Sequence, residues 1–167
     1  NISLDINNDE DADEETVILT ITETSAVSGL VISQSTHNVT ITDDEAPSII
    51  ITEVADPIDF SGRFVEIYNN GNTAINLATE KIYFVKSVNA GSDYSQIALT
   101  GTIQPNTILI IANSIDLNNG YGFTADVNFS NADGNGDDAY YLYYDGDRFT
   151  GTVLDAYGVA GIDGSDQ

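Results

Sequence analysis

The sequence predicts an all-β protein: an antiparallel β-sandwich preceded by an incomplete second β-sandwich. Many short runs alternate apolar and polar residues, the period of a strand with one face on a core. Turn-forming pairs such as Asn70-Gly71 and Asp145-Gly146 separate these runs. The composition is rich in Thr, Ile, Val and Tyr, which favour strands. No run indicates a helix, so we expect none.

The first part of the chain carries four strand-like runs. They cover residues 2–6, 16–22, 29–33 and 37–42. Four strands of this length bury too little surface to fold alone, so they read as the back half of a sandwich. We therefore expect the chain to be a piece of a longer polypeptide. We also expect the apolar face of residues 1–46 to be covered by a second copy, by the rest of the chain or by a neighbouring molecule.

The second part carries eight strand-like runs. They cover residues 48–54, 63–68, 73–77, 82–86, 95–99, 107–112, 139–144 and 149–157. This spacing is typical of an antiparallel sandwich. All eleven acids before Pro47 stand without a Lys or Arg, whereas every base of the chain follows it. This change in composition predicts two domains, residues 1–46 and 47–167.

Charge and composition exclude several function classes. The chain has 27 acidic and four basic residues, a net charge of −23, which repels phosphate backbones, so we expect no direct nucleic-acid binding. No apolar run is long enough to span a bilayer. The sequence has no Cys, and His37 is its one histidine, so triads and sulfur- or histidine-based metal sites lack their residues. We expect no enzymatic activity.

Two acid-rich stretches flank strands of the first part. Asp43, Asp44 and Glu45 follow the strand of residues 37–42, and "NNDEDADEETVILTI" leads into the strand at Val17. If both stretches lie at one end of the sandwich, their carboxylates converge. Calcium, with six to eight oxygen ligands, suits irregular acidic loops. The alternative is that these are ordinary solvated acidic loops.

The stretches "DADEETVILTI" and "VTITDDEAP" resemble the C-terminal half of a Calx-beta domain, the calcium-binding sandwich of sodium–calcium exchangers and of many bacterial surface proteins. The resemblance implies one set of metal ligands: Asp9, Glu14, Glu15, Asp43, Asp44 and Glu45. Asn8 stands where the family has a further Asp, and the first half of the family's site is missing. The resemblance therefore implies weak calcium binding, with a dissociation constant of roughly 10⁻⁴ to 10⁻³ M.

Residues 48–167 resemble the bacterial lamin-tail domain, an immunoglobulin-like sandwich. The resemblance lies in "IIITEVADPIDFSGRFVEIYNNGNTAINLATEKIYFV" and "NGDDAYYLYYDGDRFTGTVLDAYGVAGIDGSD". The Trp that usually follows the Asn-Leu strand is absent, with Ile82 or Tyr83 near its place. Together the two resemblances imply an extracellular or cell-surface location.

Two acids stand inside apolar strands of the second part. A buried carboxylate at Glu53 or Glu66 needs a partner, and the nearby cations are Arg63, Lys81 and Lys86. We expect a structural ion pair, or hydrogen bonds to loop amides, rather than catalysis.

The stretch "DGNGDDAYYLYY" begins like a calcium-binding EF-hand loop. Asp133, Asn135 and Asp137 alternate as ligands would, but Tyr144 stands where that loop needs a Glu and Asp138 where it needs a Gly. A tight turn therefore fits better than a cation site.

Four tyrosines of the next strand fall on both of its faces: Tyr140, Tyr141, Tyr143 and Tyr144. Packing in the core and at a sheet edge is the simpler interpretation. A stacking platform for sugars is the alternative.

The sequence therefore predicts a non-catalytic accessory or interaction module of a secreted or cell-surface bacterial protein, used in adhesion, spacing or anchoring. Its expected partner is a protein or a polysaccharide at the cell surface. Two alternatives stay open: an accessory part of an extracellular hydrolase such as a nuclease or phosphoesterase, and a carbohydrate-binding module. The first alternative rests only on the resemblance, because bacterial proteins with lamin-tail domains often also carry nuclease or phosphoesterase domains.

Overall fold

The computed structural model describes residues 15–20, 36–41, 46–57, 62–159 and 162. The chain divides into two compact units, Asn1–Glu45 and Ala46–Gln167. Strands dominate the described residues, with a single short α-helix among them, which confirms the all-β class.

The described part of the first unit is an antiparallel pair of strands. Its members are β1 (Glu15–Thr20) and β2 (Thr36–Ile41). Val17 lies opposite Val39, and both are half-buried, whereas Ile18 is exposed, as strand alternation requires. The expected strands at residues 2–6 and 29–33 lie outside the described residues.

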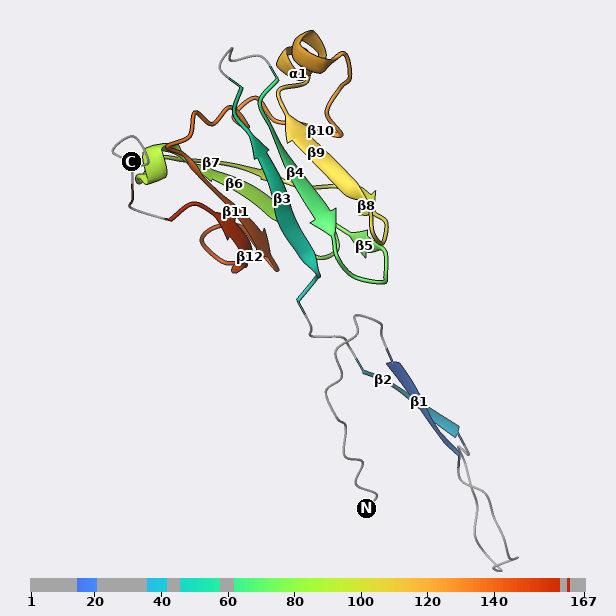
Figure 1. Cartoon of the computed structure of the whole chain (residues 1–167). Coiled ribbons are helices and arrows are strands. Elements are labelled where there is room, and N and C mark those ends of the chain that lie inside the picture. The colour runs from blue at the N-terminus through green and yellow to red at the C-terminus, as the bar shows by residue number, and fades with distance from the viewer. Residues whose placement is uncertain (1–14, 21–35, 42–45, 58–61, 160–161, 163–167) are drawn as a thin grey trace, which may run out of the picture. The chain divides into compact units, whose positions relative to one another are not determined.

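The second unit is built on two four-stranded sheets (Figure 1). The first sheet has the order β10 (Val127–Asn128), β9 (Ile108–Ala112), β4 (Phe64–Asn69) and β3 (Ile49–Ala55). The pairs β3–β4 and β4–β9 are antiparallel, and the short pair β9–β10 is parallel. We call this the β4 sheet.

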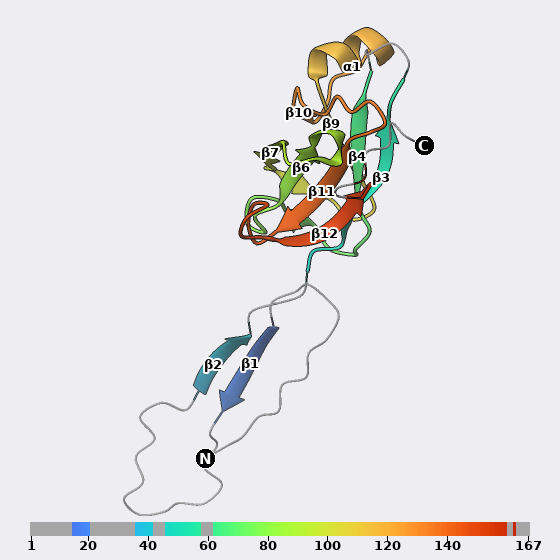
Figure 2. The same cartoon turned by 90° about the vertical axis from the view of Figure 1, so that its left-hand side faces the viewer.

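The second sheet is antiparallel throughout and packs against the first. It has the order β12 (Thr152–Tyr157), β11 (Ala139–Tyr144), β6 (Tyr83–Ser87) and β7 (Tyr94–Ala98). A small third sheet joins β5 (Ile75–Asn76) and β8 (Thr102–Ile103). Figure 2 shows β11 and β12 across the sandwich from β3 and β4. The arrangement is the two-layer sandwich that the strand spacing predicted.

The hydrophobic core lies between the two sheets. Its buried side chains are Ile49, Val65, Ile67, Ile75, Leu77, Ile82, Phe84, Leu99, Ile103, Leu109, Ile111, Ala132, Tyr140 and Leu142. Phe84 and Tyr140 stack with their ring centroids 5.4 Å apart. Burying each large apolar side chain contributes about 1.5–3 kcal/mol. The members that lie in strands come from alternate positions, so the period-two pattern of the sequence defines most of this core.

The expectation of no helix is wrong for one segment, α1 (Ser114–Tyr121). Its N-cap is Asn113, whose side-chain oxygen accepts the backbone N–H groups of the next turn, and Gly122 closes it with φ +80°. Leu117 is its buried residue and packs with Ile110 and Ala112 of β9, which face away from the main core. Figure 1 shows α1 near one end of β9. Eight residues with one buried position leave no helical period in the sequence, so only the two caps signal this helix.

Several other details differ from the predicted elements. The short strands β8 and β10 had no signal, because two residues cannot show alternation. The strand expected from residue 149 begins at Thr152, since residues 147–150 form a hydrogen-bonded turn. A 3-10 turn, η1 (Val88–Ala90), follows β6.

Candidate functional site

Five of the six predicted calcium ligands lie outside the described residues: Asp9, Glu14, Asp43, Asp44 and Glu45. Glu15 is the first residue of β1, and its main chain pairs with Ile41, the last residue of β2. The calcium site stays a prediction. Among the residues that the structure describes, no three or more His, Cys, Asp or Glu side chains gather closely enough to hold a metal ion.

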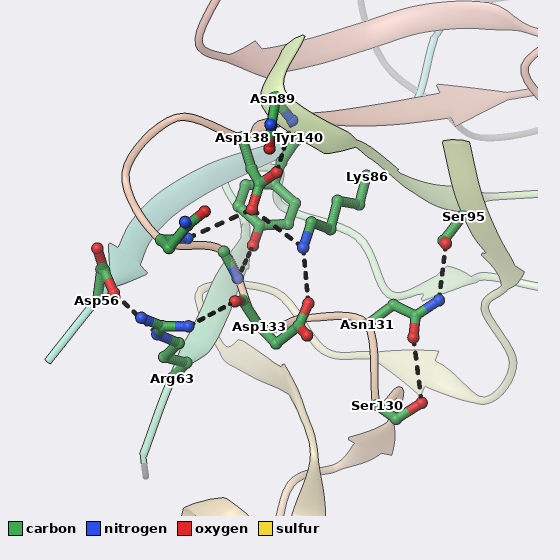
Figure 3. A network of polar contacts seen from close by, with 12 residues as sticks. Asp56, Arg63, Lys86, Asn89, Ser95, Ser130, Asn131, Asp133, Asp138 and Tyr140 are labelled. Carbon is green, nitrogen blue, oxygen red and sulfur yellow. Dashed lines mark hydrogen bonds and ion pairs between the residues drawn. The ribbon is translucent and has the colours of Figure 1, made fainter. Parts of the chain in front are cut away.

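The EF-hand-like loop is occupied by an ammonium group of the protein itself (Figure 3). Lys86 Nζ lies 2.6 Å from an oxygen of Asp133 and 3.0 Å from an oxygen of Asp138. Lys86 and Asp138 are both buried, each with 7% of its surface exposed. Two acids of the loop therefore converge on a cation, as a metal site would require, but the cation comes from β6.

Asp138 is held by the main chain as well. Its Oδ1 accepts the N–H of Asn89 at 2.9 Å, and its Oδ2 accepts the N–H of Asn135 at 3.3 Å. Asp138 directly precedes β11, so strand pairing fixes its place beside Lys86 on the neighbouring strand. The carboxylate thus joins η1, the loop and β6.

Arg63 and Tyr140 extend this network (Figure 3). Arg63 Nε lies 2.8 Å from Asp56, and its Nη1 donates to the carbonyl oxygen of Asp133 at 2.9 Å. The Tyr140 hydroxyl accepts the N–H of Gly134 at 2.7 Å. A Cβ at Gly134 would overlap that hydroxyl, so the loop needs glycine there.

Lys86 and Tyr140 of this network both have raised pKa values. Burial alone lowers the pKa of Lys86, but hydrogen bonds with Asp133 and Asp138 outweigh it and leave the pKa raised above 10.5. Burial raises the pKa of Tyr140 far above its ordinary value of 10.0. At neutral pH the lysine is an ammonium and the tyrosine a neutral phenol. Both are therefore poor nucleophiles and poor bases, and the arrangement suits a structural role.

The expected cationic partners of Glu53 and Glu66 are not found. Among the described residues neither carboxylate forms an ion pair. Glu53 is exposed, and Glu66, half-buried, accepts a 2.6 Å hydrogen bond from the Thr52 hydroxyl. Glu66 alternates with the buried Val65 and Ile67 and therefore faces outward. For Glu53 the reason is a bulge between Ile51 and Glu53, which places Glu53 opposite Glu66 on the outer side. A bulge changes which positions face the core, and the sequence alone did not show it.

Glu53 and Glu66 therefore lie directly opposite each other on β3 and β4, on the outer face of the β4 sheet. One row away on the same face, Ile50 pairs with Tyr68 and Tyr68 with Ile108. Ile50 is 38% and Ile108 52% exposed. We call these five residues the acidic–apolar face.

A second exposed aromatic group lies on the other sheet. The Arg148 guanidinium stands 4.2 Å from the ring centre of Tyr94 and 3.9 Å from that of Phe149. The exposed fraction of Phe149 is 70%.

The tyrosines of β11 lie on both faces of that strand. Tyr141 and Tyr143, with ring centroids 6.3 Å apart, are half-buried on the face opposite the core. Tyr140 and Tyr144 instead pack into the core, so the tyrosines of β11 fall on both faces as predicted.

The comparisons with known proteins add no assignment. No protein-family model matches this chain, and no curated protein matches it either. No helix within the described ranges has the length and the apolar character to cross a membrane.

Proposed function

We propose that the chain is a non-catalytic interaction module of a secreted or cell-surface bacterial protein, which binds a partner for adhesion, spacing or anchoring. The observation that carries the proposal is the acidic–apolar face. Two isoleucines and a tyrosine lie exposed or half-buried in one row on a protein of net charge −23. Apolar side chains gathered on a strongly charged surface favour a role in recognition.

The buried charges support the same interpretation. Lys86 and Asp138 are bound to each other and to loop groups, and Arg63 is bound to Asp56 and to the main chain of Asp133. Charges used in this way stabilise loops and are poor candidates for acid–base chemistry. The Calx-beta and lamin-tail resemblances of the sequence favour the extracellular location.

The test combines binding and turnover on the full chain. Labelled protein is titrated onto immobilised cell-surface polysaccharides and extracellular proteins, and the same preparation is assayed on nucleic-acid, phosphoester and glycan substrates. We expect saturable binding to at least one surface and no turnover. Turnover that persists through purification, or the absence of saturable binding across the panel, would overturn the proposal.

We further propose weak calcium binding by the first unit. The register supports it, because Glu15 pairs with Ile41, which stands two residues before Asp43 in the sequence. Calorimetry with millimolar Ca²⁺ should give heat and a raised melting temperature of the first unit, and Glu15→Gln should reduce both. If neither signal changes on adding Ca²⁺, the acidic loops are solvated and the proposal fails.

The second candidate function is carbohydrate binding, and the cluster of Arg148, Tyr94 and Phe149 favours it. A guanidinium that lies against the rings of both Tyr94 and Phe149 places stacking surfaces beside hydrogen-bond donors, a combination suited to sugar rings. A glycan array would test it. Binding that Phe149→Ala abolishes supports this candidate, and an empty array removes it.

A further inference from the structure

We infer that the acidic–apolar face binds a cationic protein segment in which Lys or Arg stands next to apolar side chains. The inference rests on the proposed interaction function and deepens it by naming the surface and the chemistry of the partner. It depends on two adjacent rows of the β4 sheet that differ in character.

The acidic row places two like charges side by side. Glu53 and Glu66 are directly opposed across the β3–β4 pair, a position in which like charges destabilise an antiparallel sheet. A partner cation between them would remove this repulsion. In the described residues this row holds two like charges and no cation, although the Thr52 hydroxyl donates to Glu66.

The chain's own bases are engaged elsewhere. Lys86 is bound to Asp133 and Asp138, Lys81 to Asp145, and Arg63 to Asp56. The guanidinium of Arg148 lies over two aromatic rings on the other sheet. A cation for the acidic row thus has to come from the partner.

The apolar row lies next to it. Ile50, Tyr68 and Ile108 are cross-strand neighbours, about 5 Å apart between strands, and the acidic row is about 7 Å further along. Tyrosine is a common anchor residue in protein interfaces. The hydroxyl of Tyr68 is oriented by a 3.1 Å hydrogen bond that it donates to Asn106. A segment that presents a Lys or Arg beside two or three apolar side chains matches both rows.

The net charge of the chain favours a cationic partner for the acidic–apolar face over a second copy of the chain or a polyanion. At −23, two copies of the chain repel each other, and stacking this face on itself would set Glu53 and Glu66 against the same pair. Polyanions are repelled too. A cationic segment is attracted by the whole molecule and pairs with the acidic row on arrival.

The test uses a random-peptide phage library, panned on the full chain with counter-selection on Glu53→Gln/Glu66→Gln/Ile108→Ser. We expect the enriched peptides to carry Lys or Arg next to apolar residues. A synthetic peptide of the most enriched sequence is then titrated by calorimetry. Exposed ion pairs are weak, so Glu53→Gln should weaken binding roughly threefold to fivefold. Ile108→Ser should weaken it about tenfold.

The matched control is Asp93→Asn, which removes one charge at another exposed acid and should change the affinity by less than about twofold. Equal losses in Asp93→Asn and Glu53→Gln would mean diffuse attraction and would overturn the inference. So would enriched peptides without cations, no enrichment at all, or dimerisation of the chain through this face in light scattering. If the panel of polysaccharides and proteins still shows saturable binding, only this inference fails and the interaction function stands.

Discussion

The carboxylate of Asp155 on β12 accepts the main-chain N–H of Ile51 on β3 at 2.7 Å. The two residues belong to different sheets and stand 104 positions apart in the chain. Each strand lies at the edge of its sheet. The contact ties one side of the sandwich together and satisfies an N–H group of an edge strand.

Replacing Asp155 with Ala should lower the free energy of unfolding by about 1–3 kcal/mol, because the N–H of Ile51 loses a charged acceptor. Asp155→Asn keeps an oxygen at the same place and should cost less. Urea denaturation of the three proteins measures both effects. Equal losses for Ala and Asn would mean that the charge, and not the acceptor geometry, supplies the stability.

Lys86→Met should lower the free energy of unfolding by roughly 2–3 kcal/mol, because it leaves Asp138 buried without its cation. This loss is at or below the lower end of the range measured when one partner of a buried ion pair is removed, because the Asp133 side chain is 56% exposed. Lys81→Met is the control: its ion pair with Asp145 lies in solvent, so the melting temperature should stay nearly unchanged. Similar losses for both lysines would contradict the structural role of Lys86.

The stability of the sandwich should fall as the pH rises above about 10. The pKa of Tyr140 is raised above 10.0 and that of Lys86 above 10.5 in the folded protein. Each group then binds its proton more tightly when folded. Its contribution is complete below the unfolded pKa and is lost as the pH rises through the folded one.

Tyr140→Phe isolates one of these groups. At neutral pH it should be less stable than the wild type, because the N–H of Gly134 loses its acceptor. The difference in melting temperature should narrow as the pH rises above 10.0, the ordinary pKa of tyrosine. Circular dichroism over a pH series measures it. A constant difference would mean that Tyr140 titrates alike in both states.

Glu53→Lys should stabilise the sandwich by about 0.2–1 kcal/mol, since it turns a like-charge pair with Glu66 into an opposite pair. Asp93→Lys changes the net charge equally and serves as the control. Thermal melts at low and high salt measure both. The gain at Glu53 should exceed that at Asp93 and shrink with salt. A loss of stability in Glu53→Lys would contradict the cross-strand register.

Asn113→Ala should destabilise α1 by about 1 kcal/mol, because the N–H groups of Ile115 and Asp116 lose their capping oxygen. Asn113→Asp keeps a capping oxygen and should retain most of the stability. Hydrogen exchange of the first helical turn reports the effect locally. Unchanged exchange in the Ala variant would mean that packing of Leu117 alone holds the helix.

Much of the fold was predictable because strands encode burial locally. The strand at residues 139–144 was predicted to the residue, and those at 49–55 and 64–69 lie within one residue of their expected ends. Alternation also placed Tyr140 and Tyr141 on opposite faces. The helix that begins at Ser114 was not predicted, because its single buried residue, Leu117, gives no helical periodicity of apolar residues.

The candidate site was less predictable, because partner choice depends on strand pairing. Asp133 looked like a cation ligand from its spacing alone, but only the pairing of β6 with β11 brings Lys86 to it. Glu53 looked buried from its neighbours, but a one-residue bulge turned it outward beside Glu66.

By itself the sequence determined that this chain is acidic, all-β and built of short alternating strands, since charge and period are properties of consecutive residues. The tertiary structure decided which charges meet. Lys86 neutralises two acids, whereas Glu53 and Glu66 face each other without a cation from the described residues. The physical reason is that Coulomb energies depend on distances between residues far apart in the chain, and those distances are fixed only when the sheets form.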